Sequence, residues 1–391
     1  MQNRIIQEEI RKHDIKVSCF FRYNRRKSER TIKNMNNSHQ IVSFKTGGGA
    51  HCITNAIRQV MEYYGYPLSE AMLFGLGSGI SFVYVNLANA PMVSGRNKVF
   101  EFEKILAKRL KIEIQCKKSK EYTVACKKVK QMLDKNQPVP VYVDMPYMSY
   151  LHMDADSHFG GHAIVLFGYD DEKKVFYVSD RDNHDYPIRT PIGNMSEDFH
   201  LVSYDEMEKA RSSVYRPFPA GNKYLVFDFH NLGQNGQSLV TEEAVKEAVA
   251  DVCDAMLNPP AQLLGLNGIS KLQREILNWR KFTDERLKTT GITNYFQISK
   301  DGGTGGGIFR KLYGEFLIEA SQMFPALKLE DIGKGFVAAA TKWDTLADRM
   351  WELGMQGKRD MLPGMSQMVA DIHQEEKRLF TNLLAAIQKE A

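Results

Sequence analysis

Apolar residues early in the chain recur with the spacing of a helix that buries one face. The apolar positions after Cys52 follow one another at intervals of three and four residues: Ile53, Ala56, Ile57, Val60, Met61 and Tyr64. This period is typical of an amphipathic helix. Three glycines, Gly47–Gly49, stand shortly before Cys52. The pattern predicts a glycine-rich loop that leads into a helix with Cys52 at its N-terminus.

Two apolar runs near the middle of the chain predict a β-hairpin. Residues 161–169 and 175–180 have the composition of strands, and the polar residues 170–174 between them suit a turn. The position midway between His162 and Asp180 falls inside this turn. In a simple hairpin the two residues therefore lie opposite one another, to within about one residue.

These two features together suggest thiol chemistry. A thiol at a helix N-terminus meets the positive end of the helix dipole, which favours the thiolate, and the free N–H groups there can hold an oxyanion. Most cysteines in such places are simply small buried residues. A histidine base and an orienting carboxylate on neighbouring strands favour catalysis. We therefore predict the catalytic set Cys52, His162 and Asp180.

The remaining pattern predicts an α+β fold followed by helices. Further elements are expected as a helix at 100–110, strands at 112–115, 139–143 and 223–230, and helices at 242–256, 270–286, 308–323, 335–353 and 366–389. We divide the chain into a basic N-terminal extension (1–40), a catalytic domain (41–232) and a helical domain (239–391). The polar stretch 231–238 has the composition of a linker.

Composition narrows the class of protein. The 391 residues are 43% apolar and 25% charged, as in ordinary globular proteins. No apolar run approaches the roughly 20 residues that span a bilayer, and the N-terminus lacks a signal-peptide core. The five scattered cysteines fit a reducing compartment. We expect a cytoplasmic enzyme that binds neither membrane nor nucleic acid, because the net charge of +5 is modest and no nucleic-acid-binding motif accompanies it.

Several segments carry a family resemblance, in matching order. They are residues 47–84 ("GGGAHCITNAIRQVMEYYGYPLSEAMLFGLGSGISFVY"), 137–150 ("QPVPVYVDMPYMSY"), 159–182 ("FGGHAIVLFGYDDEKKVFYVSDRD") and 301–321 ("DGGTGGGIFRKLYGEFLIEAS"). They resemble the BtrH type of butirosin biosynthesis, a family of acyl-carrier-protein:aminoglycoside acyltransferases. The resemblance implies a papain-like (C39-peptidase-like) cysteine domain carrying Cys52, His162 and Asp180, with an all-helical C-terminal domain. Papain-like enzymes usually carry a glutamine about six residues before the cysteine. Thr46 stands there instead, which leaves the second oxyanion donor open.

The resemblance also implies a reaction. An acyl group would pass from a carrier-protein thioester through acyl-Cys52 to a small-molecule amine, as in antibiotic assembly. No cofactor is needed beyond the phosphopantetheine arm of the carrier. A cysteine hydrolase (a peptidase or thioesterase) with the same triad is the alternative, and a non-catalytic binding module is a third. Acidic carrier proteins could dock on the basic runs Arg22–Arg30 and Cys116–Lys130. A homo-oligomer is possible.

Further residues are candidates for substrate binding. Asp154 and Asp156 lie in a polar loop before His162 and could attract a cationic amine. Glu70, at a predicted helix start, and Tyr84 are further candidates. His152 and His158 belong to the same polar loop, but their spacing does not establish a metal site, and we predict no metal. The glycines at 302–307 suit a tight turn, although their amides could also hold a phosphate of the donor arm.

Overall fold

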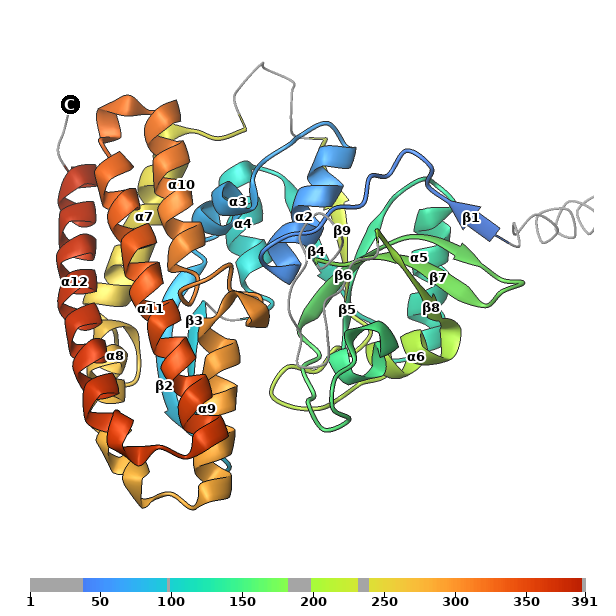
Figure 1. Ribbon diagram of the computed structural model, residues 1–391. Coiled ribbons are helices and arrows are strands. Elements are labelled where there is room, and N and C mark those ends of the chain that lie inside the picture. Colours follow the sequence, from blue (N-terminus) through green and yellow to red (C-terminus); the bar gives the residue numbers. More distant parts are fainter. Residues whose placement is uncertain (1–37, 97–98, 182–197, 231–238, 389–391) are drawn as a thin grey trace, which may run out of the picture.

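The structure of the protein is a computed structural model that describes residues 38–96, 99–181, 198–230 and 239–388 (Figure 1). Most of the expected N-terminal extension, including the basic run Arg22–Arg30, lies outside the described residues, as does the expected linker at 231–238. The last three residues of that extension form strand β1 (Ser38–Gln40), which pairs with the central sheet.

A seven-stranded antiparallel sheet forms the core of the first half of the chain. Its order is β4 (Glu113–Lys117), β9 (Tyr224–Asp228), β5 (Val139–Val143), β6 (His162–Asp170), β7 (Val175–Ser179) and β8 (His200–Ser203), and β1 pairs with the far end of β6. All residues of β6 are buried, because the strand has neighbours along both edges and helices on its faces. This burial explains why it reads as a continuous apolar run.

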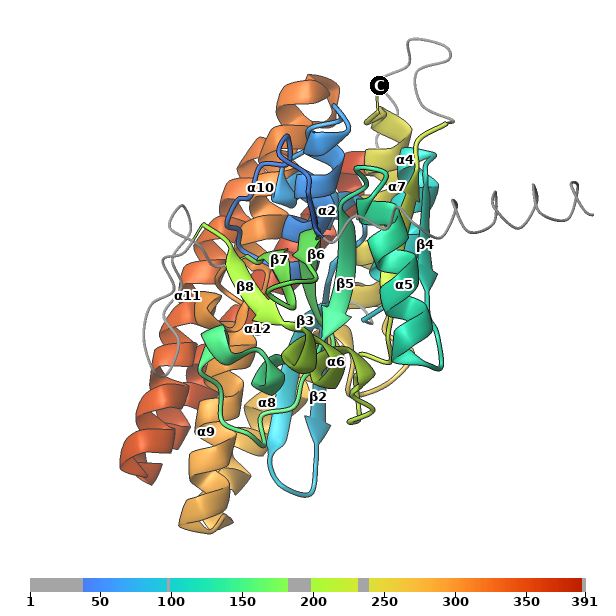
Figure 2. The same cartoon turned by 90° about the vertical axis from the view of Figure 1, so that its right-hand side faces the viewer.

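Helices flank this sheet. Helix α2 (Cys52–Tyr63) packs on β5 and β6 and lies between the sheet and the C-terminal helices, whereas α5 (Tyr122–Leu133) and α6 (Tyr204–Ser212) lie away from those helices (Figures 1 and 2). The apolar positions predicted for the buried face of α2 are buried, except that Tyr64 follows the last helical residue and is partly buried. Burial of this face places Cys52 against the first residues of β6.

The C-terminal part is helical, as predicted. Its elements are α7 (Glu242–Leu257), α8 (Gly265–Asn278), α9 (Asp284–Ile298), α10 (Arg310–Met323), α11 (Glu330–Gln356) and α12 (Leu362–Gln388). The sheet and these helices confirm the α+β class. The helix expected at 270–286 begins earlier and ends at Asn278, and α9 had not been expected. Among the described helices, none has both the length and the apolar character needed to cross a membrane.

A segment of the first half packs into this helical part. Helix α3 (Glu70–Leu76) contacts α7 and α10, and the hairpin of β2 (Ile80–Asn86) and β3 (Pro91–Arg96) contacts α8 and α9. Asn294 of α9 accepts a hydrogen bond from the Val93 amide (2.9 Å) and donates one to the Pro91 carbonyl (2.9 Å). Helix α4 (Phe102–Leu110) then returns the chain to β4. The domain boundary that we placed before residue 239 stays a prediction. One apolar core contains residues from both sides of this boundary.

Candidate active site

Cys52 occupies the first position of α2, and its side chain is buried. The preceding residue, His51, has an extended backbone and forms no side-chain cap on the helix. The first N–H groups of α2 therefore lack a capping side chain, and the Cys52 sulfur lies at the positive end of the helix.

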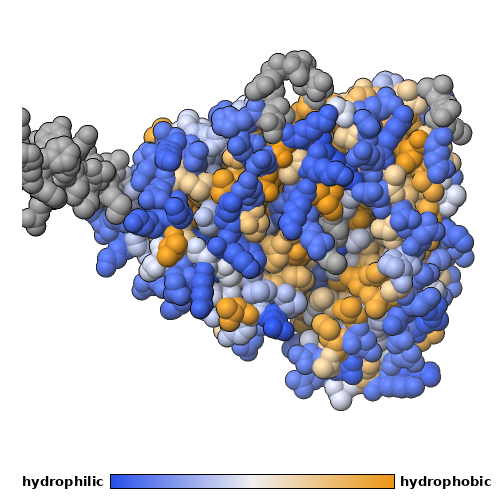
Figure 3. Space-filling model, turned by 180° about the vertical axis from the view of Figure 1, so that it is seen from behind, coloured by the Kyte–Doolittle hydropathy of each residue, from blue (hydrophilic) through white to orange (hydrophobic). Residues whose placement is uncertain are grey.

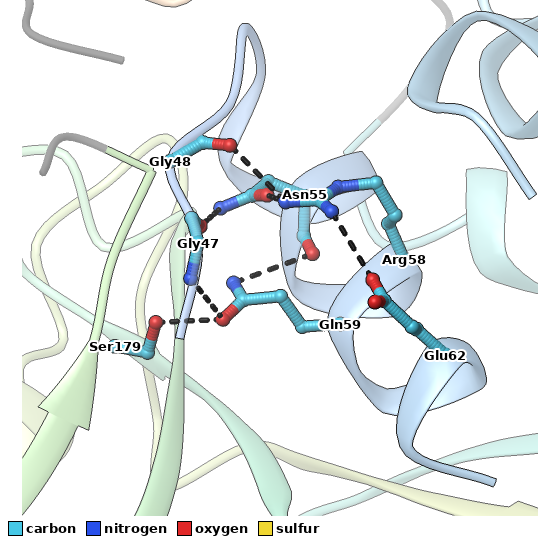
Figure 4. Close-up of polar contacts among 7 residues, drawn as sticks. All are labelled: Gly47, Gly48, Asn55, Arg58, Gln59, Glu62 and Ser179. Atoms are coloured by element: carbon cyan, nitrogen blue, oxygen red, sulfur yellow. Dashed lines mark hydrogen bonds and ion pairs between the residues drawn. The ribbon is translucent and has the colours of Figure 1, made fainter. Parts of the chain in front are cut away.

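Side chains of α2 hold the glycine run that precedes Cys52 (Figure 4). Asn55 donates to the Gly47 carbonyl (3.0 Å), and Arg58 donates to the Gly48 carbonyl (3.1 Å). The Gln59 side-chain oxygen accepts the Gly47 N–H (3.2 Å). The helix thus fixes its own entry loop, and with it the position of the cysteine.

Glu70, the first residue of α3, also holds the loop that precedes Cys52. Its carboxylate accepts the Ala50 N–H (2.5 Å) and the Thr54 hydroxyl (3.3 Å). A Cβ atom at Gly49 would stand 2.5 Å from the carboxylate, so only glycine fits there. Burial raises the pKa of Glu70 to about 7, against the opposing effect of the Ala50 hydrogen bond. These contacts commit Glu70 to the loop and do not support the substrate-binding role predicted for it.

His162 is the first residue of β6, and Asp180 directly follows the last residue of β7. Their side chains form a hydrogen bond. The His162 Nε2 and Asp180 Oδ2 atoms are 2.7 Å apart, and the Tyr150 hydroxyl donates to the same oxygen (2.8 Å). Val165 pairs with Ser179, so this register would set Asp180 opposite Ile164 rather than His162. Asp170 pairs with Val175, so the turn is centred after residue 172 rather than at 171, and an irregularity between Leu166 and Gly168 brings the register back by one residue. The two side chains meet diagonally, two residues away from the predicted register.

The thiol and the imidazole stabilise each other's charged forms. Burial acts to raise the pKa of Cys52, but a hydrogen bond to His162, the charges of His162 and Arg96, and a hydrogen bond from the Ala163 backbone bring it below its ordinary value. For His162, burial acts to lower the pKa, while the charge and hydrogen bond of Asp180 and the contact with Cys52 raise it to about 10. Nε2 faces Asp180, which leaves Nδ1 for Cys52. The arrangement favours a thiolate–imidazolium pair.

Asp180 is the carboxylate that holds this pair. Burial acts to raise its pKa, but the charge and hydrogen bond of His162, with the bonds from the Arg181 N–H and Tyr150, lower the pKa to about 2. Asp180 therefore stays ionised at any pH at which the histidine could act. Its negative charge favours the imidazolium and fixes the ring.

His51 and Arg96 complete the surroundings of the cysteine, and we had not predicted either. Arg96 at the end of β3 donates to His51 Nε2 (2.6 Å), and Thr54 lies 3.3 Å from His51 Nδ1. Burial, then the charges of Arg96 and Arg181, lower the pKa of His51 well below its usual range, so the ring is neutral. Adjacency to Cys52 could have drawn attention to His51, but nothing local in the sequence pointed to Arg96.

The helical part supplies the opposite wall of the site. The Phe309 ring contacts the His51 ring edge-on, with centroids 5.2 Å apart, and stacks on Phe74. A Cβ atom at Gly305 would stand 3.3 Å from the Ala50 Cβ, so the loop 302–307 lies against the loop that carries Cys52. The helical region thus packs against the residues that directly precede Cys52.

Most backbone amides of this glycine loop already have hydrogen-bond partners. The N–H groups of Gly303, Gly306 and Gly307 donate to the Lys300 carbonyl, the Thr304 hydroxyl and the Asp344 carboxylate, respectively. Gly302 and Ile308 donate to backbone carbonyls of Ser299 and Ile298. The amides of Gly302, Gly303, Gly306 and Gly307 are therefore not free to bind a phosphate, which favours the tight turn.

The side-chain amides of α2 do not provide the second oxyanion donor. The Gln59 NH₂ group points to the Asn55 carbonyl (3.5 Å), and its oxygen accepts the Ser179 hydroxyl (2.6 Å). The Asn55 NH₂ group donates to Gly47. The Cys52 backbone N–H at the helix start is the donor that the fold places beside the sulfur.

The other predicted binding residues lie apart from this cluster. Asp154 and Asp156 are exposed on the loop before β6, and no described contact joins them to Cys52 or His162, so their role stays a prediction. Tyr84, predicted to bind substrate, is 1% exposed on β2, and its neighbours, Trp279 among them, belong to the helical part. The structure does not bring it to the site.

The histidines of the polar loop have other partners. His158 bonds the buried Asp144 (2.8 Å) and stacks on Tyr215, and His152 is exposed. Within the described ranges, no group of three His, Cys, Asp or Glu side chains is arranged to hold a metal ion. Asp144 fixes the loop that leads into His162 by also accepting the Phe159 N–H (2.7 Å).

The lowered pKa of Cys52 gives a direct prediction. Alkylation by iodoacetamide follows the thiolate fraction, so Cys52, whose pKa is lowered, should react at a lower pH than an ordinary thiol does. The thiolate–imidazolium pair persists until the pH reaches the pKa of His162, which is raised to about 10. Cys116 is an internal control, since desolvation by neighbouring groups and the charge of Glu103 raise the pKa of its thiol. Peptide-resolved mass spectrometry at pH 6 should show Cys52 labelled faster than the exposed Cys116. Equal rates would contradict the ion pair.

Comparison with known proteins agrees with this geometry. Residues 51–181 match the family described as butirosin biosynthesis protein H, N-terminal, and residues 205–383 match a domain of unknown function, DUF4872. No curated protein matched the chain. One similar solved structure is described as a C39-like peptidase from Bacillus anthracis, with 12% identity, 49% of this chain and 97% of that chain covered, and a TM-score of 0.32. The assignment rests on the family match and on the site itself. Residues 51–181 thus form a domain of the BtrH N-terminal type that carries the cysteine, histidine and aspartate of the site, and a helical C-terminal region follows it.

Proposed function

We propose that the protein is a thiol-dependent acyltransferase that forms amide bonds in natural-product biosynthesis. The observation that carries this proposal is the buried pair of Cys52 and His162, with Asp180 on the far side of the imidazole. The family that residues 51–181 match is named for butirosin biosynthesis, and its members resemble this chain in the segments that hold all three residues.

The first half-reaction uses the charged pair. The Cys52 thiolate attacks the carbonyl carbon of an acyl thioester, and the Cys52 backbone N–H faces the developing oxyanion. The intermediate collapses by breaking the bond to the donor sulfur, which takes the proton of the His162 imidazolium and leaves as a thiol. Acyl-Cys52 and a neutral His162 remain.

The second half-reaction regenerates the enzyme. An amine attacks acyl-Cys52, and neutral His162 accepts the proton that the nitrogen loses. The bond to sulfur then breaks, giving an amide, the Cys52 thiolate and the His162 imidazolium. Acylation removes the negative charge of Cys52, one of the causes that raise the pKa of His162. His162 is therefore a better base in the acyl-enzyme than in the resting state.

Enclosure of the site favours an amine over water. Phe309 and the loop 302–307 pack against the residues that directly precede Cys52, and Cys52 and His162 are both buried. A site that restricts water protects a thioester from hydrolysis. The exposed carboxylates of Asp154 and Asp156, on the loop before β6, would attract a cationic amine.

A carrier protein is the proposed donor. Exposed lysines lie on β4 and α5 and in the turn between them: Lys117, Lys118, Lys120, Lys127 and Lys128. They belong to the half of the molecule whose rear surface is mostly hydrophilic, whereas larger apolar areas lie over the helical half (Figure 3). Such a basic surface suits an acidic carrier.

The identity of the products tests the proposal. We expect purified protein, incubated with acyl thioesters of N-acetylcysteamine and a panel of amines, to release amides in preference to free acids, as read by mass spectrometry. The matched control omits the amine. The acyl adduct on Cys52 should then persist. Free acid as the main product across the whole panel, or efficient peptide cleavage, would favour the hydrolase alternative.

A further inference from the structure

Arg181, which directly follows Asp180, carries a buried charge that the described residues do not fully pair. Its side chain is 5% exposed. The Nη2 atom donates to the backbone carbonyl of Asp301 (2.9 Å), while Nη1 is buried and has no hydrogen-bond partner in the described part of the chain. A buried guanidinium nitrogen without an acceptor is costly. An acceptor supplied by a ligand would remove that cost.

The guanidinium lies beside the nucleophile loop. The Arg181 carbonyl accepts the Gly49 N–H (2.6 Å), which ties its backbone to the residues just before Cys52. On the other side, a Cβ atom at Gly303 would stand 3.2 Å from the Arg181 Cζ atom, and Gly303 has a φ of +80°. Glycine at 303 therefore lets the helical part approach the guanidinium closely. Arg181 is positioned between the loops at 47–51 and 302–307.

The groups around Arg181 do not neutralise it. Asp180 is bonded to His162, and the Asp301 carboxylate accepts the Tyr295 hydroxyl (2.6 Å). Within the described ranges, no carboxylate lies within ion-pair distance of Arg181. Arg96, Arg181 and the His162 imidazolium are positive, and the Cys52 thiolate and Asp180 are negative. The pKa of the nearby Glu70 is raised to about 7, so the site carries a net positive charge when Glu70 is protonated. A site of this charge attracts an anion.

We propose that Arg181 binds an anionic group, a carboxylate or a phosphate, of the molecule that reacts with Cys52. The two chemistries share the oxygen acceptors that a guanidinium fork recognises. The inference rests on the proposed role of Cys52 as nucleophile and adds to it a substrate class: a donor or acceptor that carries negative charge near its reacting carbon.

Paired alkylating reagents test this without knowledge of the natural substrate. Iodoacetate and 3-bromopropionate carry a carboxylate, and each has a neutral amide counterpart. The measured quantity is the ratio of Cys52 labelling rates, anionic over neutral, from peptide-resolved mass spectrometry. Arg181→Gln should lower this ratio by about tenfold or more, since charge-assisted hydrogen bonds are lost. Arg274→Gln, which removes an exposed charge on α8, should keep the ratio of the unaltered protein.

Two further measurements complete the test. Inorganic phosphate and acetate, added separately, should slow the labelling of Cys52 by iodoacetamide, and the stronger protector identifies the preferred anion. Arg181→Lys, which keeps the charge but not the planar fork, should weaken this protection, and it serves if the glutamine variant does not fold. Equal ratios in the Arg181 and Arg274 variants, or absence of protection by both anions, would overturn the anion site alone. Failure of every reagent to label Cys52 would instead count against the proposed function.

Discussion

Replacing Cys52 by alanine should abolish acyl transfer and leave the fold intact. The thiolate is the atom that bonds the acyl group, so its removal should cost on the order of 10⁶-fold in kcat, as loss of a triad nucleophile does. The fold should survive because the entry loop is held by Asn55, Arg58, Gln59 and Glu70, and not by the sulfur. Turnover of an acyl thioester and intact mass of the acylated protein are the two readouts. The wild-type protein should gain the acyl mass, and the alanine variant should not.

Two variants separate chemistry from packing. Cys52→Ser replaces the sulfur by an oxygen at nearly the same position. This variant should also be inactive, since a serine hydroxyl does not ionise beside His162 as a thiol does. Cys126→Ser removes a thiol on α5, away from the helix start, and should keep full activity. Near-ultraviolet circular dichroism and the thermal midpoint check that each variant folds. Substantial turnover by Cys52→Ala would rule out covalent catalysis by this residue.

The sequence identified the parts of the site that depend on local order. Cys52 follows a glycine run at the start of a periodic helix, and His162 and Asp180 flank a short hairpin, so their spacing along the chain nearly determines their spacing in space. The error of two residues in the hairpin register arose because the turn is centred later than position 171: Asp170 pairs with Val175, which puts the centre between residues 172 and 173. Side-chain alternation kept the two residues on the same face despite that shift.

The residues that the sequence did not identify come from distant elements. Arg96 reaches His51 from the end of a hairpin packed among the C-terminal helices, and Phe309 reaches it from the loop before α10. Neither contact leaves a local pattern. Helix α9 was missed for a different reason: its buried face includes Thr290, Gly291 and Asn294, which do not register as apolar. These residues are buried because they bond or closely approach neighbouring backbone.

The hairpin β2–β3 was missed because its alternation is masked. The inward residues Ile80, Phe82 and Tyr84 alternate with Ser81, Val83 and Val85, and two of these outward residues are also apolar. A period of two is then hard to see. Placement of this hairpin and of α3 among the C-terminal helices depends on packing between segments far apart in sequence, which the order of elements does not specify.

Removal of His162 should cost far more than removal of the Asp180 charge. His162 both stabilises the thiolate and moves the proton in each half-reaction, so His162→Ala should reduce kcat by about 10²–10⁴-fold. Asp180→Asn can still accept a hydrogen bond from the ring and orient it, but it withdraws the negative charge that raises the pKa of His162 to about 10. The asparagine variant should therefore lose less activity than the alanine variant.

The pH dependence distinguishes these roles. With Asp180 neutralised, the pKa of His162 should fall, and the thiolate–imidazolium pair should be lost at a lower pH than in the unaltered protein. The rate of acylation of Cys52, measured by stopped-flow release of the donor thiol across pH 5–10, should show its upper limb shifted to lower pH in Asp180→Asn. His152→Ala, at an exposed site on the neighbouring loop, is the matched control and should leave the profile unaltered. An unshifted upper limb in Asp180→Asn, or a larger loss in the control than in His162→Ala, would show that another group serves as the base.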